Sequence, residues 1–257
     1  MKNQVAIVTG AGKGIGLAIA NQLAQDGFKV IVNDIDAVTA NNAAQQLTSK
    51  GYQAHAIAAD ISQREQAQQL VTSAVEHYGR LDVMVNNAGL VAVAPLLEVD
   101  NQHFDKLFDV NVKGLLWCAQ AAAAVMIQQG EGGRIINAGS AASHRSEALI
   151  GVYSATKFAV RTLTQTLALE LAPHKINVNA YCPGIVETSM WETIDSAACS
   201  YLNAPEGTVK QSLIDRIPLG RIQTPEDVAN LVSFFASEKG DYLTGQCVLT
   251  DGGLVMV

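Results

Sequence analysis

The stretch VAIVTGAGKGIG (residues 5–16) decides the fold of this chain. It starts as an apolar, β-branched run typical of a buried strand and passes through a glycine loop into the helical spacing of LAIANQLAQDG. Glycines permit a tight turn and let backbone N–H groups approach a pyrophosphate, while the helix N-terminus adds partial positive charge. The stretch therefore predicts a dinucleotide-binding strand, loop and helix. A structural turn without a ligand is the alternative.

Strand-like and helix-like segments alternate along the rest of the chain, including one long helix from about His103 to Gln129. This alternation predicts an α/β fold: a single Rossmann-type, doubly wound parallel sheet of about seven strands, with helices on both faces. No linker divides residues 1–257, so one domain is expected. An irregular stretch at about 185–217 is interpreted as a substrate lid, with a plain surface excursion as the alternative. The further strands are expected in KVIVND, YQAHAIAAD, LDVMVNNAG, GRIINAGS, KINVNAYCPG and QCVLTDGG.

Composition excludes several classes of function. The chain has 257 residues, a net charge of −7 and no block of basic residues, so a nucleic-acid groove is not expected. Apolar stretches such as AAAAVMI are too short to span a bilayer, and no signal-peptide pattern opens the chain, so a cytoplasmic protein without membrane contact is expected. The four cysteines have no metal-ligand spacing, so we expect free thiols and no metal site.

An acidic residue and a tyrosine–lysine pair are candidate functional residues. Asp34 ends the second strand, where a carboxylate can accept hydrogen bonds from ribose hydroxyls and repel a 2′-phosphate. In YSATK, Tyr153 and Lys157 stand four apart and share one helix face. A nearby ammonium favours the phenolate, so the pair is expected to act as a general acid or base, with a lowered tyrosine pKa. Two ordinary helix residues are the alternative.

These motifs together resemble the short-chain dehydrogenase/reductase family over nearly the whole chain. The loop has the family's TGxxxGxG form, NNAG (86–89) ends the fourth strand, and VNVKG contains Asn111. INAGS contains Ser140, followed by YSATK and by the Pro183–Gly184 turn. The resemblance implies a nicotinamide-dependent oxidoreductase that interconverts a small ketone and a secondary alcohol.

The resemblance also implies roles for single residues. Ser140 orients the substrate oxygen, Tyr153 moves its proton, Lys157 tunes Tyr153 and holds the ribose, and Asn111 holds a water that relays protons. A loop serine and a structural asparagine are the alternatives for Ser140 and Asn111, and a helix-capping role is the alternative for Asp60. Cofactor contacts are implied at Gly10, Gly12, Lys13, Gly14, Ile15, Gly16, Asp34, Asp60, Ile61, Asn87, Ala88, Gly89, Tyr153, Lys157, Pro183, Gly184, Val186 and Thr188.

The cofactor is predicted to be NAD. Asp34 disfavours a 2′-phosphate, although Lys13 occupies a position where a basic residue often accompanies NADP in the family. The carboxylate is given more weight because it would stand directly beside that phosphate. NADP is the alternative.

Within the family, the chain is most similar to the acetoin (diacetyl) reductases, or 2,3-butanediol dehydrogenases, in KFAVRTLTQT, NAYCPGIVETSMWETID and DYLTGQ. Met190 and Trp191 are expected to close an apolar lid over the substrate beside Ser140, Ala141 and Tyr153. The run SAASHRSEAL departs from that subgroup, because Ala141 lacks an amide and Arg145 and Glu147 bring charge.

Three other functions remain open at this point. A polyol dehydrogenase and a 3-oxoacyl-carrier-protein reductase would use the same catalytic residues. A non-enzymatic NAD sensor is a further alternative, although such proteins usually lose one of the serine, tyrosine and lysine. The resemblance also implies a homotetramer.

Overall fold

The computed structural model describes residues 3–257 and contains one parallel sheet of seven strands. The strand order is β3-β2-β1-β4-β5-β6-β7. Strands β2 and β3 are added on one side of β1 and strands β4 to β7 on the other, so the topological switch point lies between β1 and β4. The fold prediction is confirmed, because a doubly wound sheet of this order is the Rossmann arrangement. The strands are β1 (Val5–Val8), β2 (Lys29–Asp34), β3 (Ala54–Ala58), β4 (Val83–Asn86), β5 (Gly133–Ala138), β6 (Ile176–Pro183) and β7 (Cys247–Thr250).

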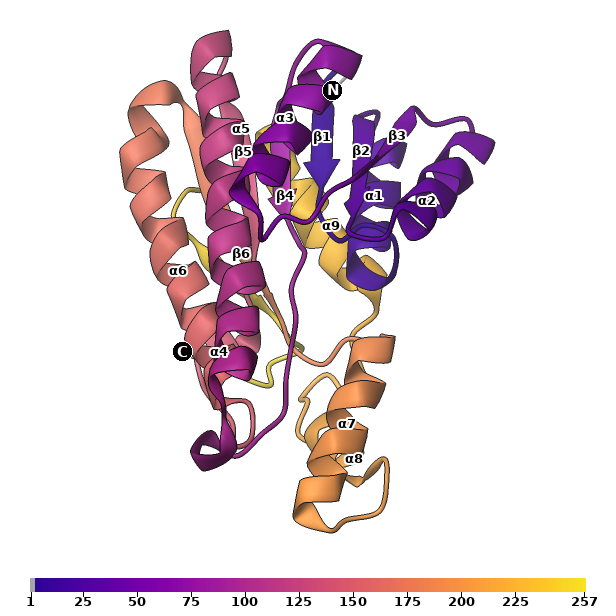
Figure 1. Ribbon diagram of the computed structural model, residues 1–257, viewed down its shortest axis with the longest axis vertical. Coiled ribbons are helices and arrows are strands. Elements are labelled where there is room, and N and C mark those ends of the chain that lie inside the picture. Colours follow the sequence, from indigo (N-terminus) through magenta and orange to yellow (C-terminus); the bar gives the residue numbers. More distant parts are fainter. Residues whose placement is uncertain (1–2) are drawn as a thin grey trace.

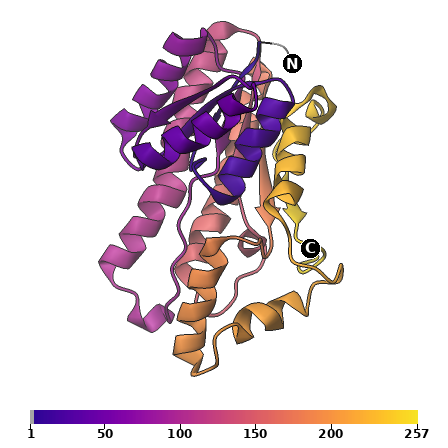
Figure 2. The same ribbon diagram turned by 90° about the vertical axis from the view of Figure 1, so that its right-hand side faces the viewer.

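Helices cover both faces of the sheet (Figures 1 and 2). One layer holds α1 (Gly14–Gln25), α2 (Ala37–Ser49) and α9 (Pro225–Ala236), and Ile19, Leu47 and Val232 belong to its core. The other layer holds α3 (Arg64–Tyr78), α5 (Leu115–Gln129) and α6 (Gly151–Leu171), and Leu70, Ala119 and Leu167 belong to its core. Strands covered on both faces are continuous apolar runs, as VAIV in β1 illustrates.

The long helix predicted from about His103 to Gln129 is present, and it is not uniform. It consists of α4 (Asn101–Phe108), a π-helical segment at Asp109–Gly114, and α5. π-Helical turns inside helices are frequent at functional sites. By length and composition this run of 29 residues could cross a membrane, contrary to the expectation that every apolar stretch is too short. It packs against the sheet through the buried residues Leu115, Cys118, Ala119, Ala122, Ala123 and Met126, as the core helix of a globular protein does.

The segment 185–217 was predicted to be irregular, and that prediction is wrong. It contains α7 (Ser189–Leu202) and α8 (Thr208–Ile214), which project beyond the carboxyl ends of the strands (Figure 1). Asp195 of α7 is buried, and its carboxylate accepts hydrogen bonds from the backbone N–H groups of Gly207 and Lys210 at the start of α8. The two helices therefore form one joined unit.

A chain of buried polar groups links β4, β5 and α6. The Asn86 amide donates to Asn137 Oδ1 over 2.9 Å, and the Asn137 amide donates to Thr164 Oγ1 over 2.9 Å. All three side chains are at most 2% exposed. Because buried amides are costly without partners, this chain fixes α6 against β5, which ends two residues before Ser140.

Replacement of Asn137 by Ala tests this link. We expect Asn137→Ala to lower the free energy of unfolding by about 2–3 kcal/mol, because Asn86 and Thr164 would each lose a buried partner. Chemical denaturation measures the change, with Asn41→Ala on the exposed face of α2 as the control. Equal stability of the two variants would contradict this account.

Candidate active site

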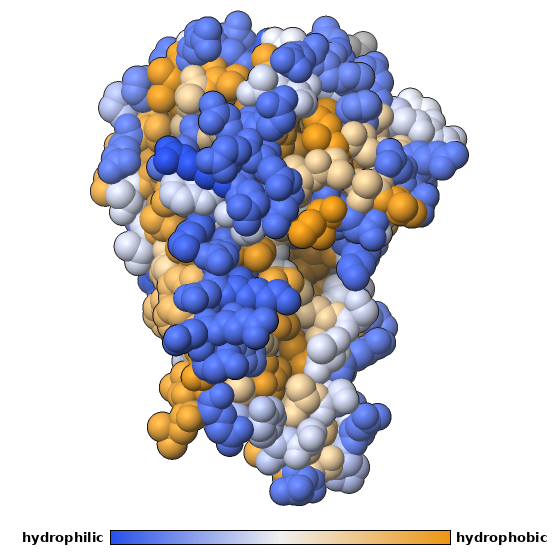
Figure 3. Space-filling view, viewed as in Figure 1, coloured by the Kyte–Doolittle hydropathy of each residue, from blue (hydrophilic) through white to orange (hydrophobic). Residues whose placement is uncertain are grey.

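A cavity of about 1400 Å³ runs along the carboxyl ends of the strands. It extends from the glycine loop after β1 to Ser140 after β5 and to the helices α7 and α8. Hydrophobic side chains line the furrow between α4 and these two helices in the space-filling view (Figure 3). Pockets for single small ligands are commonly about 300–1000 Å³, so this cavity has room for a dinucleotide together with a small substrate.

The glycine loop fits a pyrophosphate. Gly10 and Gly14 have φ of 61° and 56°, a region that favours glycine. A Cβ at Gly16 would collide with the Gly10 carbonyl, whereas one at Gly14 would meet only Thr188 within 4 Å, so Gly14 leaves the approach to the helix N-terminus open. The Asn87 amide donates to the carbonyls of Thr9 and Gly10 and holds the loop against β4.

The end of β2 offers an acceptor for ribose hydroxyls. Asp34 lines the cavity, and its Oδ2 accepts a 3.1 Å hydrogen bond from the Gly12 N–H. Gly12 itself does not line the cavity; it packs on Asp34 and Thr39 and so supports the carboxylate from behind. Asp60 also lines the cavity and accepts from Ser62 N–H in the turn before α3; the N-cap residue of α3 is Gln63, and Asp60 does not cap the helix.

Most of the predicted site residues line this one cavity. Apart from Gly12, every predicted cofactor contact does so, and so does every predicted substrate contact. They are Gly10, Lys13, Gly14, Ile15, Gly16, Asp34, Asp60, Ile61, Asn87, Ala88, Gly89, Ser140, Ala141, Tyr153, Lys157, Pro183, Gly184, Val186, Thr188, Met190 and Trp191.

Asn86 and Asn111 lie behind the cavity wall. The Asn86 side chain is not part of the cavity lining and belongs to the buried polar chain inside the sheet. Asn111, in the π-helical segment, accepts from Leu90 N–H over 2.7 Å and donates to Leu90 O and Thr156 Oγ1. Each polar atom of its side chain thus has a protein partner, which favours the structural alternative over the water relay.

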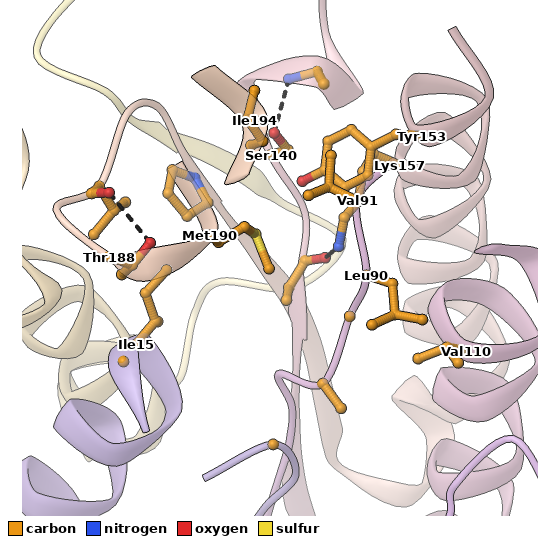
Figure 4. A pocket seen from close by; sticks show the side chains of 18 of the residues that line it. Ile15, Leu90, Val91, Val110, Ser140, Tyr153, Lys157, Thr188, Met190 and Ile194 are labelled. Carbon is orange, nitrogen blue, oxygen red and sulfur yellow. Dashed lines mark hydrogen bonds between the residues drawn. The ribbon is translucent and has the colours of Figure 1, made fainter. Parts of the chain in front are cut away.

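The tyrosine, lysine and serine meet at one end of the cavity (Figure 4). The Lys157 ammonium lies 5.6 Å from the centre of the Tyr153 ring and donates a 2.8 Å hydrogen bond to the Ala138 carbonyl of β5. Ser140 Oγ accepts from Ala142 N–H over 3.1 Å, which leaves its own proton for donation to Tyr153 or to a substrate oxygen. In the same view, Ile15 and Thr188 lie on the opposite side of the cavity.

Burial dominates the protonation of this pair. It raises the pKa of Tyr153, and a hydrogen bond with Ser140 acts weakly in the opposite direction. It lowers the pKa of Lys157 to about 8. The expectation of a lowered tyrosine pKa is therefore wrong for the protein alone, because desolvation raises the pKa of Tyr153 and is the largest contribution. At neutral pH the hydroxyl keeps its proton.

Charges at the mouth of the cavity are paired with one another. Arg145 and Glu147 form a 2.7 Å ion pair, and Arg216, after α8, lies 3.4 Å from the same carboxylate. Arg145 and Glu147 line the cavity, yet each is nearly half exposed. The pair thus lies at the rim, and the interior near Met190 of α7 remains apolar.

Sequence reasoning missed the apolar side of the cavity. Beside the predicted residues, it is lined by Val91, Leu149, Ile150, Ile194, Leu213 and Val255. Helical periodicity in SMWETIDSAACSYL could have revealed α7 and thus Ile194. Leu213 lies in α8, and the remaining residues come from loops, from the start of α6 and from the tail, which carry no periodic pattern.

The depressed pKa of Lys157 predicts a measurable cost to folding. Below about pH 8 the folded protein must bury the ammonium, so Lys157→Met should raise the free energy of unfolding at pH 7 by on the order of 3 kcal/mol. The gain should shrink as the pH rises from 8 towards the ordinary lysine value. Denaturation at several pH values measures it, with exposed Lys239→Met as the control. Destabilisation by Lys157→Met at pH 7 would contradict the argument.

Comparison with known proteins agrees with this geometry. The family model for short chain dehydrogenases matches residues 4–198. The chain is 48% identical to an (S)-acetoin-forming diacetyl reductase of Staphylococcus epidermidis, over 98% of this chain and 99% of that enzyme. It is 41% identical to the L-2,3-butanediol dehydrogenase of Corynebacterium glutamicum, over 98% and 99% of the two chains.

A solved structure shows the same fold. The 3-ketoacyl-(acyl-carrier-protein) reductase from Brucella melitensis, crystallised with NADH, matches with a TM-score of 0.87 and 31% identity over 98% of each chain. The glycine loop, the serine, tyrosine and lysine at one cavity, and these full-length relatives lead to one conclusion: the chain belongs to the short-chain dehydrogenase family and is an oxidoreductase.

Proposed function

We propose that the protein is an NAD-dependent reductase of small vicinal ketones, which converts diacetyl to acetoin and interconverts acetoin and 2,3-butanediol. The convergence of Ser140, Tyr153 and Lys157 in the cavity that begins at the glycine loop carries this proposal. The full-length similarity to a diacetyl reductase and a butanediol dehydrogenase supports the choice of substrate.

In this proposal each polar residue has one task. The bound nicotinamide supplies or accepts the hydride. The Ser140 hydroxyl donates a hydrogen bond to the substrate oxygen and stabilises developing negative charge there. Tyr153, protonated because burial raises its pKa, gives its proton to the same oxygen during reduction. Lys157, fixed by the Ala138 carbonyl, holds positive charge beside Tyr153 and offers N–H donors to a ribose.

Asp34 supports the choice of NAD. Its carboxylate is oriented by the Gly12 N–H and faces the cavity at the end of β2. A 2′-phosphate there would meet negative charge, whereas ribose hydroxyls would meet an acceptor. Lys13 also lines the cavity and would offset part of this repulsion, which makes NADP the second choice.

The unit of α7 and α8 acts as the lid in this proposal. Asp195 joins the two helices, and Met190 and Trp191 on the first turn of α7 line the cavity. Their apolar surface suits an uncharged ketone. Arg145 and Glu147, which are nearly half exposed, neutralise each other in an ion pair.

The proposal includes a cytoplasmic homotetramer. Phe158 and Leu169 of α6 and Ile127 of α5 are 41%, 80% and 40% exposed. Exposed apolar side chains on neighbouring helices are typical of surfaces that pair with another subunit. Light scattering measures the assembly.

Reduced-cofactor oxidation tests the function. We expect the purified protein to oxidise NADH when diacetyl or acetoin is the substrate. With these substrates, NADH oxidation should be at least tenfold faster than NADPH oxidation. It should also be faster than NADH oxidation with a sugar ketone or an acetoacetyl thioester. Tyr153→Phe should reduce kcat by roughly 10³-fold or more while NADH binding persists, because the substrate oxygen loses its proton donor.

Other outcomes select other functions. Turnover confined to NADPH and the thioester would identify a carrier-protein reductase and overturn the role given to Asp34. Preferred turnover of the sugar ketone would identify a polyol dehydrogenase. NADH binding without any turnover would favour a sensor.

A further inference from the structure

Leu149 has a backbone conformation that leucine normally avoids. Its φ is 66°, in the left-handed region. Among residues 3–257, the other non-glycine residues with positive φ are Asn3, Lys175 and Asn203. Asparagine tolerates this region, and Lys175 and Asn203 end helical segments. Leu149 is the one apolar member of this set, and such outliers often mark functional sites.

The surroundings of Leu149 hold this conformation in place. Its carbonyl accepts a 2.8 Å hydrogen bond from Ala94 N–H, in the loop that follows β4. Two residues later, Gly151 packs so closely on Leu96 that a Cβ there would collide with the leucine side chain. The turn is thus fixed to the loop that carries Val91, and it leads directly into α6, which contains Tyr153.

The turn does not need leucine. A glycine would adopt φ of 66° without strain and would offer the same carbonyl to Ala94. What glycine lacks is the side chain, and Leu149 is half-buried, lines the same cavity as Ser140 and Tyr153, and stands four residues before Tyr153 in the chain. The presence of leucine is explained if its side chain has a function in the site that compensates for the loss of stability caused by the positive φ.

We propose that Leu149 is a specificity-determining residue, whose side chain forms the apolar wall that limits the size of the ketone beside Tyr153. This inference rests on the proposed function and extends it to a substrate class: ketones with small alkyl groups on both sides of the carbonyl. A hydrophobic wall discriminates by roughly 10–200-fold for each methylene that it excludes or accepts.

Two variants separate the wall from the strain. Leu149→Gly removes the side chain and relieves the strain, whereas Leu149→Ala removes the side chain and keeps the strain. Both should raise the ratio of kcat/KM for 1-phenylpropane-1,2-dione to that for diacetyl by at least about tenfold. Leu149→Gly should also melt about 2–4 °C above Leu149→Ala, the reverse of the usual order of glycine and alanine.

Leu97 provides the matched control. It is fully exposed, does not line the cavity and is absent from the residues with positive φ, so Leu97→Ala should be at least as stable as Leu97→Gly. The selectivity ratio should stay unchanged in both Leu97 variants. An unchanged ratio in both Leu149 variants would overturn the wall, and Leu149→Ala melting at or above Leu149→Gly would overturn the strain argument. Failure of the unmodified protein to reduce either dione would instead contradict the proposed function.

Discussion

The burial of the Lys157 ammonium is the constraint on which the site depends. The side chain is 4% exposed, and the contact that holds it is the hydrogen bond to the Ala138 carbonyl. No carboxylate forms an ion pair with Lys157 in the part of the chain that the structure describes. A buried charge with one neutral partner is expensive, so the fold must supply rigidity around it.

That rigidity comes from groups that never touch the cavity. The chain of Asn86, Asn137 and Thr164 ties α6 to β4 and β5, and Asn111 ties the π-helical segment to Leu90 and Thr156. These contacts keep the start of α6 fixed relative to Ser140. The tyrosine, lysine and serine are therefore positioned by buried amides, and the surface ion pairs at the rim contribute little to that positioning.

Sequence reasoning found the sheet, most of its helices and the part of the cavity wall that runs from the glycine loop to Ser140 and Lys157. It succeeded because the carboxyl ends of parallel strands meet at one edge, so residues that follow strands, such as Asp34 and Ser140, come together. It could not place the amides of Asn86 and Asn111, because a motif does not tell which face of a strand or helix a side chain occupies, and the water relay at Asn111 stays a prediction. It also failed for Leu149, because a positive φ at leucine has no local signature and is imposed by tertiary contacts such as the one to Ala94.

The sequence also misjudged the balance between charge and desolvation. Four-residue spacing on a helix correctly made Tyr153 and Lys157 neighbours, but spacing carries no information on burial depth. In the protein alone, burial raises the pKa of Tyr153, so the tyrosine keeps its proton, as reduction requires. The reverse reaction needs a phenolate, so additional positive charge in the cavity must lower the tyrosine pKa.

The pKa of Tyr153 with and without oxidised NAD therefore tests the central claim most directly. Ultraviolet difference titration of the unmodified protein against Tyr153→Phe isolates this one hydroxyl. The account predicts a pKa above the ordinary value of about 10 for the protein alone and a decrease of at least about two units with oxidised NAD bound. A value that stays above about 10 in the presence of oxidised NAD would contradict the assignment of Tyr153 as the acid and base of this site.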